Sequence, residues 1–203
     1  MQPQSKSAKL NKPRKPILAI TIGDPAGIGP EIVVKTLAKN NIYQICQPVI
    51  IGTKSVLDFY LKKYPSVVSS RIFDLIDIGK IKKLRFSKID AAYGRLAYKY
   101  IKKAVELAQT GQVDGIVTAP ISKEALNRAG LNYSGHTEIF AKLTGIKNLL
   151  MLMVNKKVKV AMVTRHLPLG EVVKELTVEK VFLAIKLAIQ GLEKYFSNTL
   201  NSL

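Results

Sequence analysis

Residues 17–31 carry the sequence ILAITIGDPAGIGPE, which predicts how the fold begins. Residues 17–22 are almost all apolar and have the length of a short buried strand. Residues 23–29 contain three glycines, as expected of a tight loop. A helix is predicted over residues 30–39, because Pro30 suits the first helical position and Glu31 complements the positive end of the helix dipole. A strand, a glycine loop and a helix in this order are typical of a βαβ unit.

The same alternation continues along the chain. Apolar runs of strand length occur at residues 48–51, 72–78 and 115–118, and helical patterns occur at residues 56–61 and 122–129. A longer helix is predicted from Asp90 to Gly111, where apolar side chains recur on one face. These side chains are Tyr93, Leu96, Ala97, Tyr100, Ala104, Leu107 and Ala108. The fold class is therefore α/β with a mostly parallel sheet.

The C-terminal part has a different pattern. Residues 149–154 and 158–163 flank Asn155, Lys156 and Lys157, so they form either a hairpin or two adjacent strands. A final helix is predicted from Thr177, and its apolar stripe needs a partner surface. The stripe consists of Val178, Val181, Phe182, Ile185, Ala188, Ile189, Leu192 and Phe196.

Composition excludes several classes of protein. The chain has 203 residues and 47% apolar content, enough for a core, so it is not a disordered chain. Its apolar runs fall short of the roughly 20 residues that a membrane-spanning helix needs, so we expect no membrane association. Cys46 is the only cysteine, which rules out an internal disulfide and a four-cysteine zinc site. A cytoplasmic location is the default expectation.

The chain is strongly basic, with 32 Lys and Arg against 14 Asp and Glu and a net charge of +18. Such a charge attracts anions, which include phosphorylated metabolites, nucleic acid and lipid surfaces. Residues 1–16 contain five basic residues, no acidic ones and three prolines, and are predicted to be a disordered tail. No aromatic residue lies among these lysines for base stacking, which disfavours a nucleic-acid-binding arm.

Two loops after predicted strands are candidate ligand sites. The loop at residues 23–29 lets the backbone approach a ligand, and the helix start after it attracts phosphate or carboxylate. It is neither a Walker A loop nor a dinucleotide fingerprint, since Ile32 occupies the position of the third glycine. The alternative is that the glycines at residues 23–29 serve only to pack a tight connection between the strand and the helix, without a ligand. Lys123, after the strand at residues 115–118, is either an anion ligand or a surface charge.

Both histidines of the chain lie in candidate sites. His136 and Thr137 form part of a Gly- and Ser-containing loop before an apolar helix, and their side chains suit a hydroxylated or phosphorylated small molecule. The alternative is a helix cap with Thr137 at the N-cap and His136 exposed. His166 follows the strand at residues 158–163, where it can bind a metal, transfer a proton or bond the loop backbone. A three-histidine metal site cannot be built from two histidines.

Four stretches, taken together and in order, resemble a known family. They are ITIGDPAGIGPE at residues 20–31, DGIVTAPISKEAL at 114–126, YSGHTEIFA at 133–141 and VTRHLPL at 163–169. These stretches resemble those of 4-hydroxythreonine-4-phosphate dehydrogenase, and the resemblance covers roughly residues 17–196. It implies an isocitrate/isopropylmalate dehydrogenase-like fold of two α/β lobes and a homodimer whose clefts borrow residues from the partner.

The resemblance also implies an activity. Family members oxidise the secondary alcohol of 4-phosphooxy-L-threonine with NAD and decarboxylate the product, in pyridoxal phosphate (vitamin B6) biosynthesis. His136 and Thr137 are then expected to contact the substrate, and His166 to supply one ligand to a divalent cation such as Zn, Mg or Co. The resemblance assigns no catalytic base and no residue that binds NAD.

The resemblance ends before the family's length is reached. Family members continue for about another domain's length, with two more metal-binding histidines, groups for the substrate phosphate and much of the NAD site. Residues 17–203 are therefore expected to be the N-terminal portion of a two-lobe dehydrogenase that lacks its C-terminal part. Two alternatives are a dehydrogenase of a phosphorylated four-carbon sugar acid, such as threonate or erythronate 4-phosphate, and a non-enzymatic basic remnant.

Overall fold

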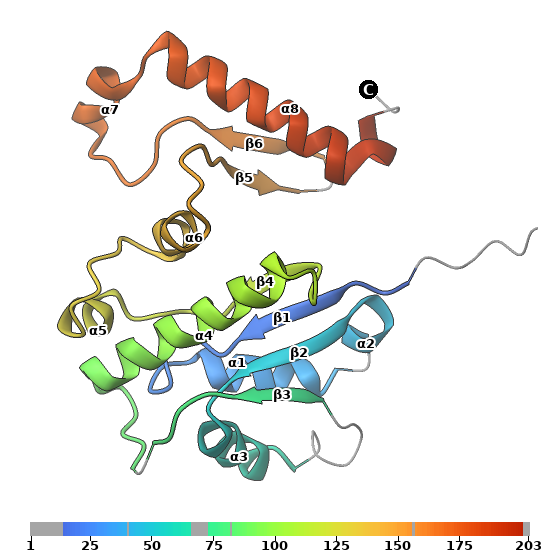
Figure 1. Cartoon of the computed structure of the whole chain (residues 1–203), viewed down its shortest axis with the longest axis vertical. Helices are drawn as coiled ribbons and strands as arrows, with labels where there is room; N and C mark the ends of the chain where they lie inside the picture. The colour runs from blue at the N-terminus through green and yellow to red at the C-terminus, as the bar shows by residue number, and fades with distance from the viewer. Residues whose placement is uncertain (1–13, 40, 66–72, 82, 156, 201–203) are drawn as a thin grey trace, which may run out of the picture. The chain divides into compact units, whose positions relative to one another are not determined.

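A four-stranded parallel sheet organises the first part of the chain (Figure 1). The computed structural model describes residues 14–39, 41–65, 73–81, 83–155 and 157–200, and they fall into two compact units divided after Thr144. In unit 1 the strand order is β3-β2-β1-β4. The strands are β1 (Ile17–Thr21), β2 (Gln47–Gly52), β3 (Asp74–Asp77) and β4 (Gly115–Thr118). The predicted α/β class and parallel sheet are confirmed.

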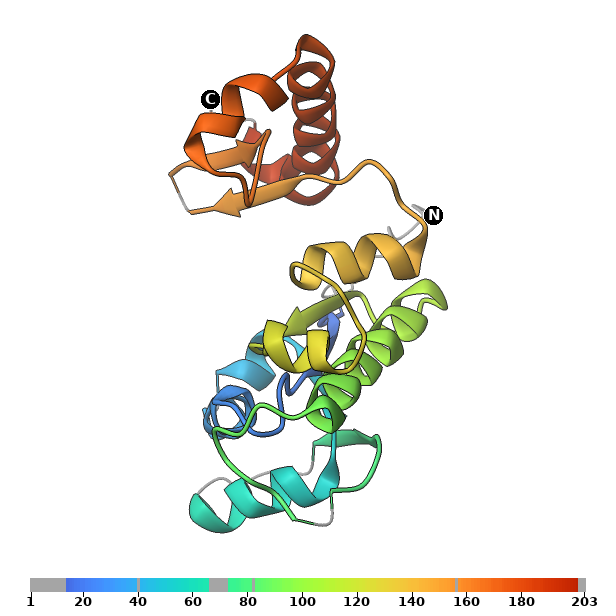
Figure 2. The same ribbon diagram turned by 90° about the vertical axis from the view of Figure 1, so that its left-hand side faces the viewer.

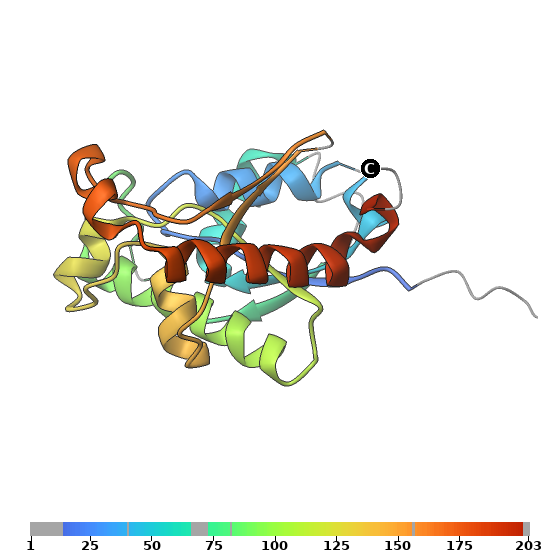
Figure 3. The ribbon, with the colours of Figure 1, turned by 90° about the horizontal axis from the view of Figure 1, so that it is seen from above.

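Helices cover both faces of this sheet. They are α1 (Gly29–Leu37), α2 (Ile42–Ile45), α3 (Lys54–Lys63), α4 (Ala91–Gln109), α5 (Lys123–Arg128) and α6 (His136–Thr144). Because parallel crossovers are right-handed, α1 and α3, which lead toward β3, lie on one face, whereas α4 returns across the other (Figure 3). Ile22, Ile50 and Leu57 are among the fully buried side chains of the core.

Helix α4 follows its predicted pattern closely. The Asp90 side chain caps it by accepting from the N–H of Ala92 at 2.9 Å, and the chain turns at Gly111 with a φ of +69°. Six of the seven predicted apolar positions are buried, from Tyr93 to Leu107. The fully buried Tyr100 hydroxyl shares a hydrogen bond of 2.5 Å with Thr53, which ties α4 to the start of α3.

The last residues of the predicted tail, just before β1, bond to the start of β4. Residues 1–13 lie outside the described part of the chain, so a disordered tail stays a prediction. Arg14 donates to both carboxylate oxygens of Asp114 at 2.7 Å, and the N–H of Ile17 donates to the same carboxylate at 2.8 Å. These bonds join the starts of β1 and β4, which are neighbours in the sheet.

Unit 2 consists of a hairpin and two helices (Figure 2). Strands β5 (Met151–Val154) and β6 (Lys159–Met162) pair antiparallel, so the hairpin is the correct one of the two predicted arrangements. Helices α7 (Leu169–Glu175) and α8 (Val178–Leu200) follow, and α8 packs on β6. Four residues of its predicted stripe are half or more exposed, at 81%, 67%, 53% and 50% for Val178, Phe182, Ile185 and Ile189. That face of α8 is uncovered within unit 2.

No helix among the described residues is long and apolar enough to cross a bilayer.

Candidate functional site

The carboxyl ends of β1 and β4 form the switch point of the sheet in unit 1. The chain leaves β1 toward β2 on one side, and β4 lies on the other side, so the loops after β1 and β4 meet at the edge where open α/β sheets bind ligands. The N–H of Asp24 donates to the Pro120 carbonyl at 2.9 Å, and the N–H of Ala119 donates to the Thr21 carbonyl at 3.0 Å. Two of the predicted candidate loops are thus in direct contact.

Glycine is required in the first of these loops. Gly23 has a φ of +73°, and a Cβ there would lie 2.2 Å from the Pro120 carbonyl oxygen. A Cβ on Gly29 would lie 2.3 Å from the carbonyl oxygen of Ile22. Close packing of the backbone therefore explains both glycines, in agreement with the alternative that the loop is tightened for packing. The same packing brings the loop backbone to the edge formed by the carboxyl ends of β1 and β4.

Two buried polar residues at the end of β1 were missed by sequence reasoning. The Asp24 carboxylate accepts from the N–H of Ala26 at 2.8 Å, and burial raises its pKa while that hydrogen bond opposes the shift. The Thr21 hydroxyl is fully buried and has no hydrogen-bond partner among the described residues. An acidic residue in a Gly–Pro loop after an apolar strand was the available signal for Asp24. Nothing local marks Thr21.

The first turn of α6 places the predicted substrate residues beside the β4 loop. The helix begins at His136, whose imidazole is half-buried, so the alternative with Thr137 as the N-cap and an exposed His136 is wrong. Burial lowers the pKa of His136, and a hydrogen bond with the backbone of Ala119 acts in the opposite direction. Thr137 is also half-buried.

Two polar atoms in this turn lack partners within the described parts of the chain. They are Nε2 of His136 and Oε2 of Glu138, and both are buried. Buried polar atoms are nearly always hydrogen-bonded, so atoms left without partners indicate a place that a ligand or water fills. An imidazole nitrogen and a carboxyl oxygen can each exchange a hydrogen bond with a hydroxylated molecule.

The lowered pKa of His136 predicts a pH dependence of stability. Its ordinary value is 6.5, and because the folded state takes up the proton less readily, the unfolded chain is protonated first as the pH falls. The free energy of unfolding should therefore fall below about pH 6.5 by a component that His136→Gln lacks. Urea unfolding of both proteins at about pH 7.5 and about pH 5.5 measures this component. If the difference in unfolding free energy between the unaltered chain and His136→Gln is the same at both pH values, the prediction is wrong.

A shallow hollow of about 470 Å³ lies beside the glycine loop. Its lining is mainly apolar and aromatic and also includes the oppositely charged Glu31 and Lys63. The remaining lining residues are Ala26, Gly27, Ile28, Phe59, Tyr60, Phe86 and Ser87. The ring centroids of Phe59 and Phe86 are 4.9 Å apart.

His166 belongs to unit 2 and stands just beyond β6. It is exposed, with a left-handed φ of +56° that is uncommon for a residue with a side chain. The neighbouring Thr164 and Arg165 line a hollow of about 330 Å³ between the hairpin and α8. His136 belongs to unit 1 and His166 to unit 2, so a cleft shared by the two histidines stays a prediction.

The residues of the described chain do not make a complete cation site. No group of three His, Cys, Asp or Glu side chains comes together among them. A catalytic divalent cation normally takes three protein ligands, and His166 offers one. No chemical step through a cation can therefore be built from these residues. Lys123 lies exposed in the first turn of α5.

Comparison with known proteins agrees with the fold. A profile of the family described as "Pyridoxal phosphate biosynthetic protein PdxA" matches residues 44–201. A Clostridium botulinum protein named "Putative D-threonate 4-phosphate dehydrogenase" is 37% identical over 195 residues, which cover 89% of this chain and 58% of that protein. The chain thus spans less than two thirds of the length of this relative.

The chain also resembles solved structures of dehydrogenases. The chain is similar to a 4-hydroxythreonine-4-phosphate dehydrogenase from Burkholderia phymatum, with a TM-score of 0.76, 36% identity and coverage of 86% of this chain and 57% of that one. The enzyme of that name from Klebsiella pneumoniae gives a TM-score of 0.79 at 31% identity, with coverage of 88% and 59%. The expected dehydrogenase-like α/β fold is confirmed, and the chain belongs to the PdxA family.

Proposed function

We propose that this chain takes part in the NAD-dependent oxidation of a secondary alcohol in a phosphorylated four-carbon acid, followed by decarboxylation. The first candidate substrate is 4-phosphooxy-L-threonine, in cytoplasmic pyridoxal phosphate biosynthesis. The observation that carries the proposal is the unpartnered buried Nε2 of His136, whose ring contacts the backbone of Ala119 in the loop after β4, at the edge of a parallel sheet where ligands bind. Membership of the PdxA family supports it.

The described side chains suggest how a substrate is held. His136 has a lowered pKa and is therefore neutral near pH 7, so its ring can exchange hydrogen bonds with a hydroxyl group. The backbone of Ala119 orients that ring, and the Thr137 hydroxyl extends the polar surface along the same turn. NAD, when bound, accepts the hydride from the alcohol carbon. His166 would contribute one ligand to a Zn, Mg or Co ion whose other ligands come from outside the described residues.

A second candidate substrate is D-threonate 4-phosphate, after which the Clostridium botulinum relative is named. It carries a hydroxyl where the threonine derivative carries an ammonium group. A homodimer is also proposed, and the uncovered apolar face of α8 supports it.

The test measures binding and turnover of both acids by the purified chain. Titration calorimetry gives the affinities, and NADH absorbance gives the rates with added Zn, Mg or Co. Thr137→Val should weaken binding of the preferred acid by about 2- to 10-fold, as expected for one lost hydrogen bond. Thr36→Val is the matched control, because the Thr36 hydroxyl donates to the Ile32 carbonyl within α1. If neither acid binds or is oxidised, even when the C-terminal half of a family member is co-expressed as a second chain, the proposal is wrong.

A further inference from the structure

The loop that follows β6 carries a cation without an acidic partner. Arg165 lies between β6 and α7 and is half-buried. Within the described ranges, its guanidinium takes part in no ion pair and no hydrogen bond. The acidic residues that follow it in sequence have other partners, since Glu171 pairs with Lys174 and Glu175 with Lys180. A partly desolvated guanidinium that lacks a carboxylate favours the binding of an anion.

Arg165 and Thr164 line the hollow between the hairpin and α8, and most of its other walls are apolar. Residues on the hairpin side include Leu150, Met162 and Val163, and those on α8 are Leu183, Ala184 and Leu187. The volume of about 330 Å³ lies at the lower end of the range of roughly 300–1,000 Å³ found for small-molecule sites. The hollow therefore has room for one small ligand.

The polar part of the lining carries a net positive charge. Glu175 and Lys180 also line the hollow, and Nζ of Lys180 lies 2.5 Å from Oε2 of Glu175, so their charges offset each other. The positive charge that remains belongs to Arg165. The Thr164 hydroxyl makes no hydrogen bond in the part of the chain that the structure describes, so it can donate to a ligand.

These features together select a class of ligand. A guanidinium binds a carboxylate through two parallel N–H···O hydrogen bonds, and the adjacent apolar walls favour a hydrocarbon chain. The phosphorylated hydroxy acids considered as substrates carry polar groups along their whole length. They would leave the walls formed by Leu183 and Leu187 without an apolar partner, so a different kind of acid fits this hollow.

We propose that the hollow of unit 2 binds a short aliphatic carboxylic acid in its ionised form. The carboxylate lies against Arg165 and Thr164, and the hydrocarbon chain packs between Met162 and the α8 residues Leu183 and Leu187. All of these residues belong to unit 2. The site therefore goes beyond the proposed dehydrogenase function and does not depend on it.

NMR titration of the full chain, with ¹³C-labelled methyl groups in Ile, Leu and Met, tests the proposal. The probe is octanoate, and the comparison probes are 1-octanol, acetate and inorganic phosphate. Octanoate should bind at least about tenfold more tightly than any of the other three, because only octanoate combines the charge with the hydrocarbon chain. The methyl signals of Met162, Leu183 and Leu187 should shift on its addition.

Two variants separate the charge from the apolar wall. Arg165→Gln should weaken octanoate binding by about tenfold and leave 1-octanol binding unchanged. Ala184 is 6% exposed in the wall of the hollow, so Ala184→Leu should fill space and weaken binding of both probes by about tenfold. Thermal melts check that both variants are folded.

Lys186→Gln is the matched control for charge. Lys186 is an exposed lysine of α8 outside the lining, and its replacement removes the same charge as Arg165→Gln. Equal losses of octanoate affinity in Arg165→Gln and Lys186→Gln would overturn the proposal, since they would indicate general attraction of anions to a basic chain.

Two other results would also overturn the proposal. One is equal affinity for octanoate and 1-octanol. The other is a set of methyl shifts confined to Ile185 and Ile189, which lie on the exposed face of α8 and would indicate adsorption to that face. Either result would leave the proposed dehydrogenase function unaffected, because that function rests on His136 in unit 1.

Discussion

Replacing Gly94 with alanine is expected to lower the free energy of unfolding of unit 1 by about 3 kcal/mol. Gly94 lies inside α4 where α5 crosses it, and an added Cβ would stand 2.1 Å from the Ala125 carbonyl oxygen and 2.7 Å from the Leu126 nitrogen. The backbone of α5 cannot move aside as the end of a flexible side chain can, so α4 and α5 must move apart. Leu126 is fully buried against Ile101 and Ile139, and its displacement reaches α6, which carries His136.

This result would be opposite to the usual effect of the substitution. Alanine in place of glycine within a helix normally stabilises by roughly 0.5–1 kcal/mol. Gly191 in α8 is the control, because a Cβ there meets no atom within 4 Å, so Gly191→Ala should be neutral or stabilising. Urea unfolding followed by circular dichroism measures both variants. A Gly94→Ala protein as stable as the unaltered chain would show that α4 and α5 do not approach this closely.

Removing the imidazole of His166 should have the largest effect on activity. His166→Gly and His166→Asn are expected to lower NADH formation from the phosphorylated acid by about 100-fold or more, the loss typical of a disturbed metal site. Both replacements tolerate the left-handed backbone at this position, where φ is +56°, so stability should not fall. A loss of activity then reports on the imidazole and not on folding.

The control for His166 lies in the same unit. Lys186 is exposed on α8, and Lys186→Ala should leave the rate unchanged. Rates are compared with the C-terminal half of a family member co-expressed as a second chain, under saturating substrate and NAD, and unfolding curves are recorded for each variant. Full activity in both His166→Gly and His166→Asn would remove His166 from the reaction, whatever the resemblance implies.

Much of unit 1 could be predicted from local sequence. Apolar runs and helical periodicity predicted the strands and the long helix, because side-chain spacing along a strand or a helix face is a property of neighbouring residues. Sequence also singled out the two histidines and the loops that carry them. The hairpin of unit 2 remained one of two alternatives, since a short turn between apolar runs does not by itself fix the pairing.

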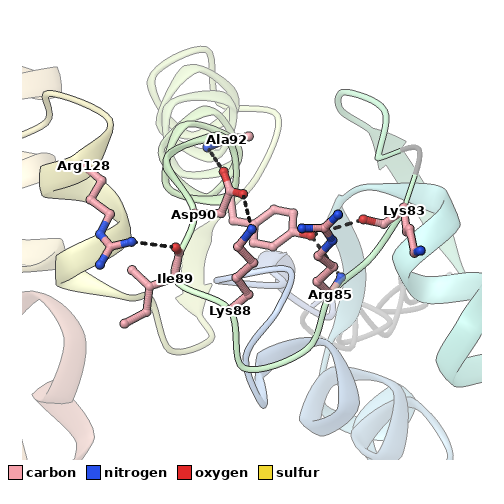
Figure 4. Close-up of polar contacts among 8 residues, drawn as sticks. Lys83, Arg85, Lys88, Ile89, Asp90, Ala92 and Arg128 are labelled. Atoms are coloured by element: carbon pink, nitrogen blue, oxygen red, sulfur yellow. Dashed lines mark hydrogen bonds and ion pairs between the residues drawn. The ribbon is translucent and has the colours of Figure 1, made fainter.

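Other features exist only because distant segments meet. Arg14 and Asp114 are 100 positions apart, and the glycine at position 94 is required by α5, more than 30 residues further along the chain. Whether the buried polar atoms of Thr21, His136 and Glu138 have hydrogen-bond partners depends on which residues the fold places next to them. The stretch at residues 83–87 gives no local signal of its conformation, and its backbone is fixed by the Tyr93 hydroxyl, which accepts from the N–H of Arg85 (Figure 4), and by the Ala26 carbonyl, which accepts from the N–H of Ser87. Local spacing sets which side chains share a face, whereas burial and unpaired polar atoms depend on tertiary contacts, which no window of sequence contains.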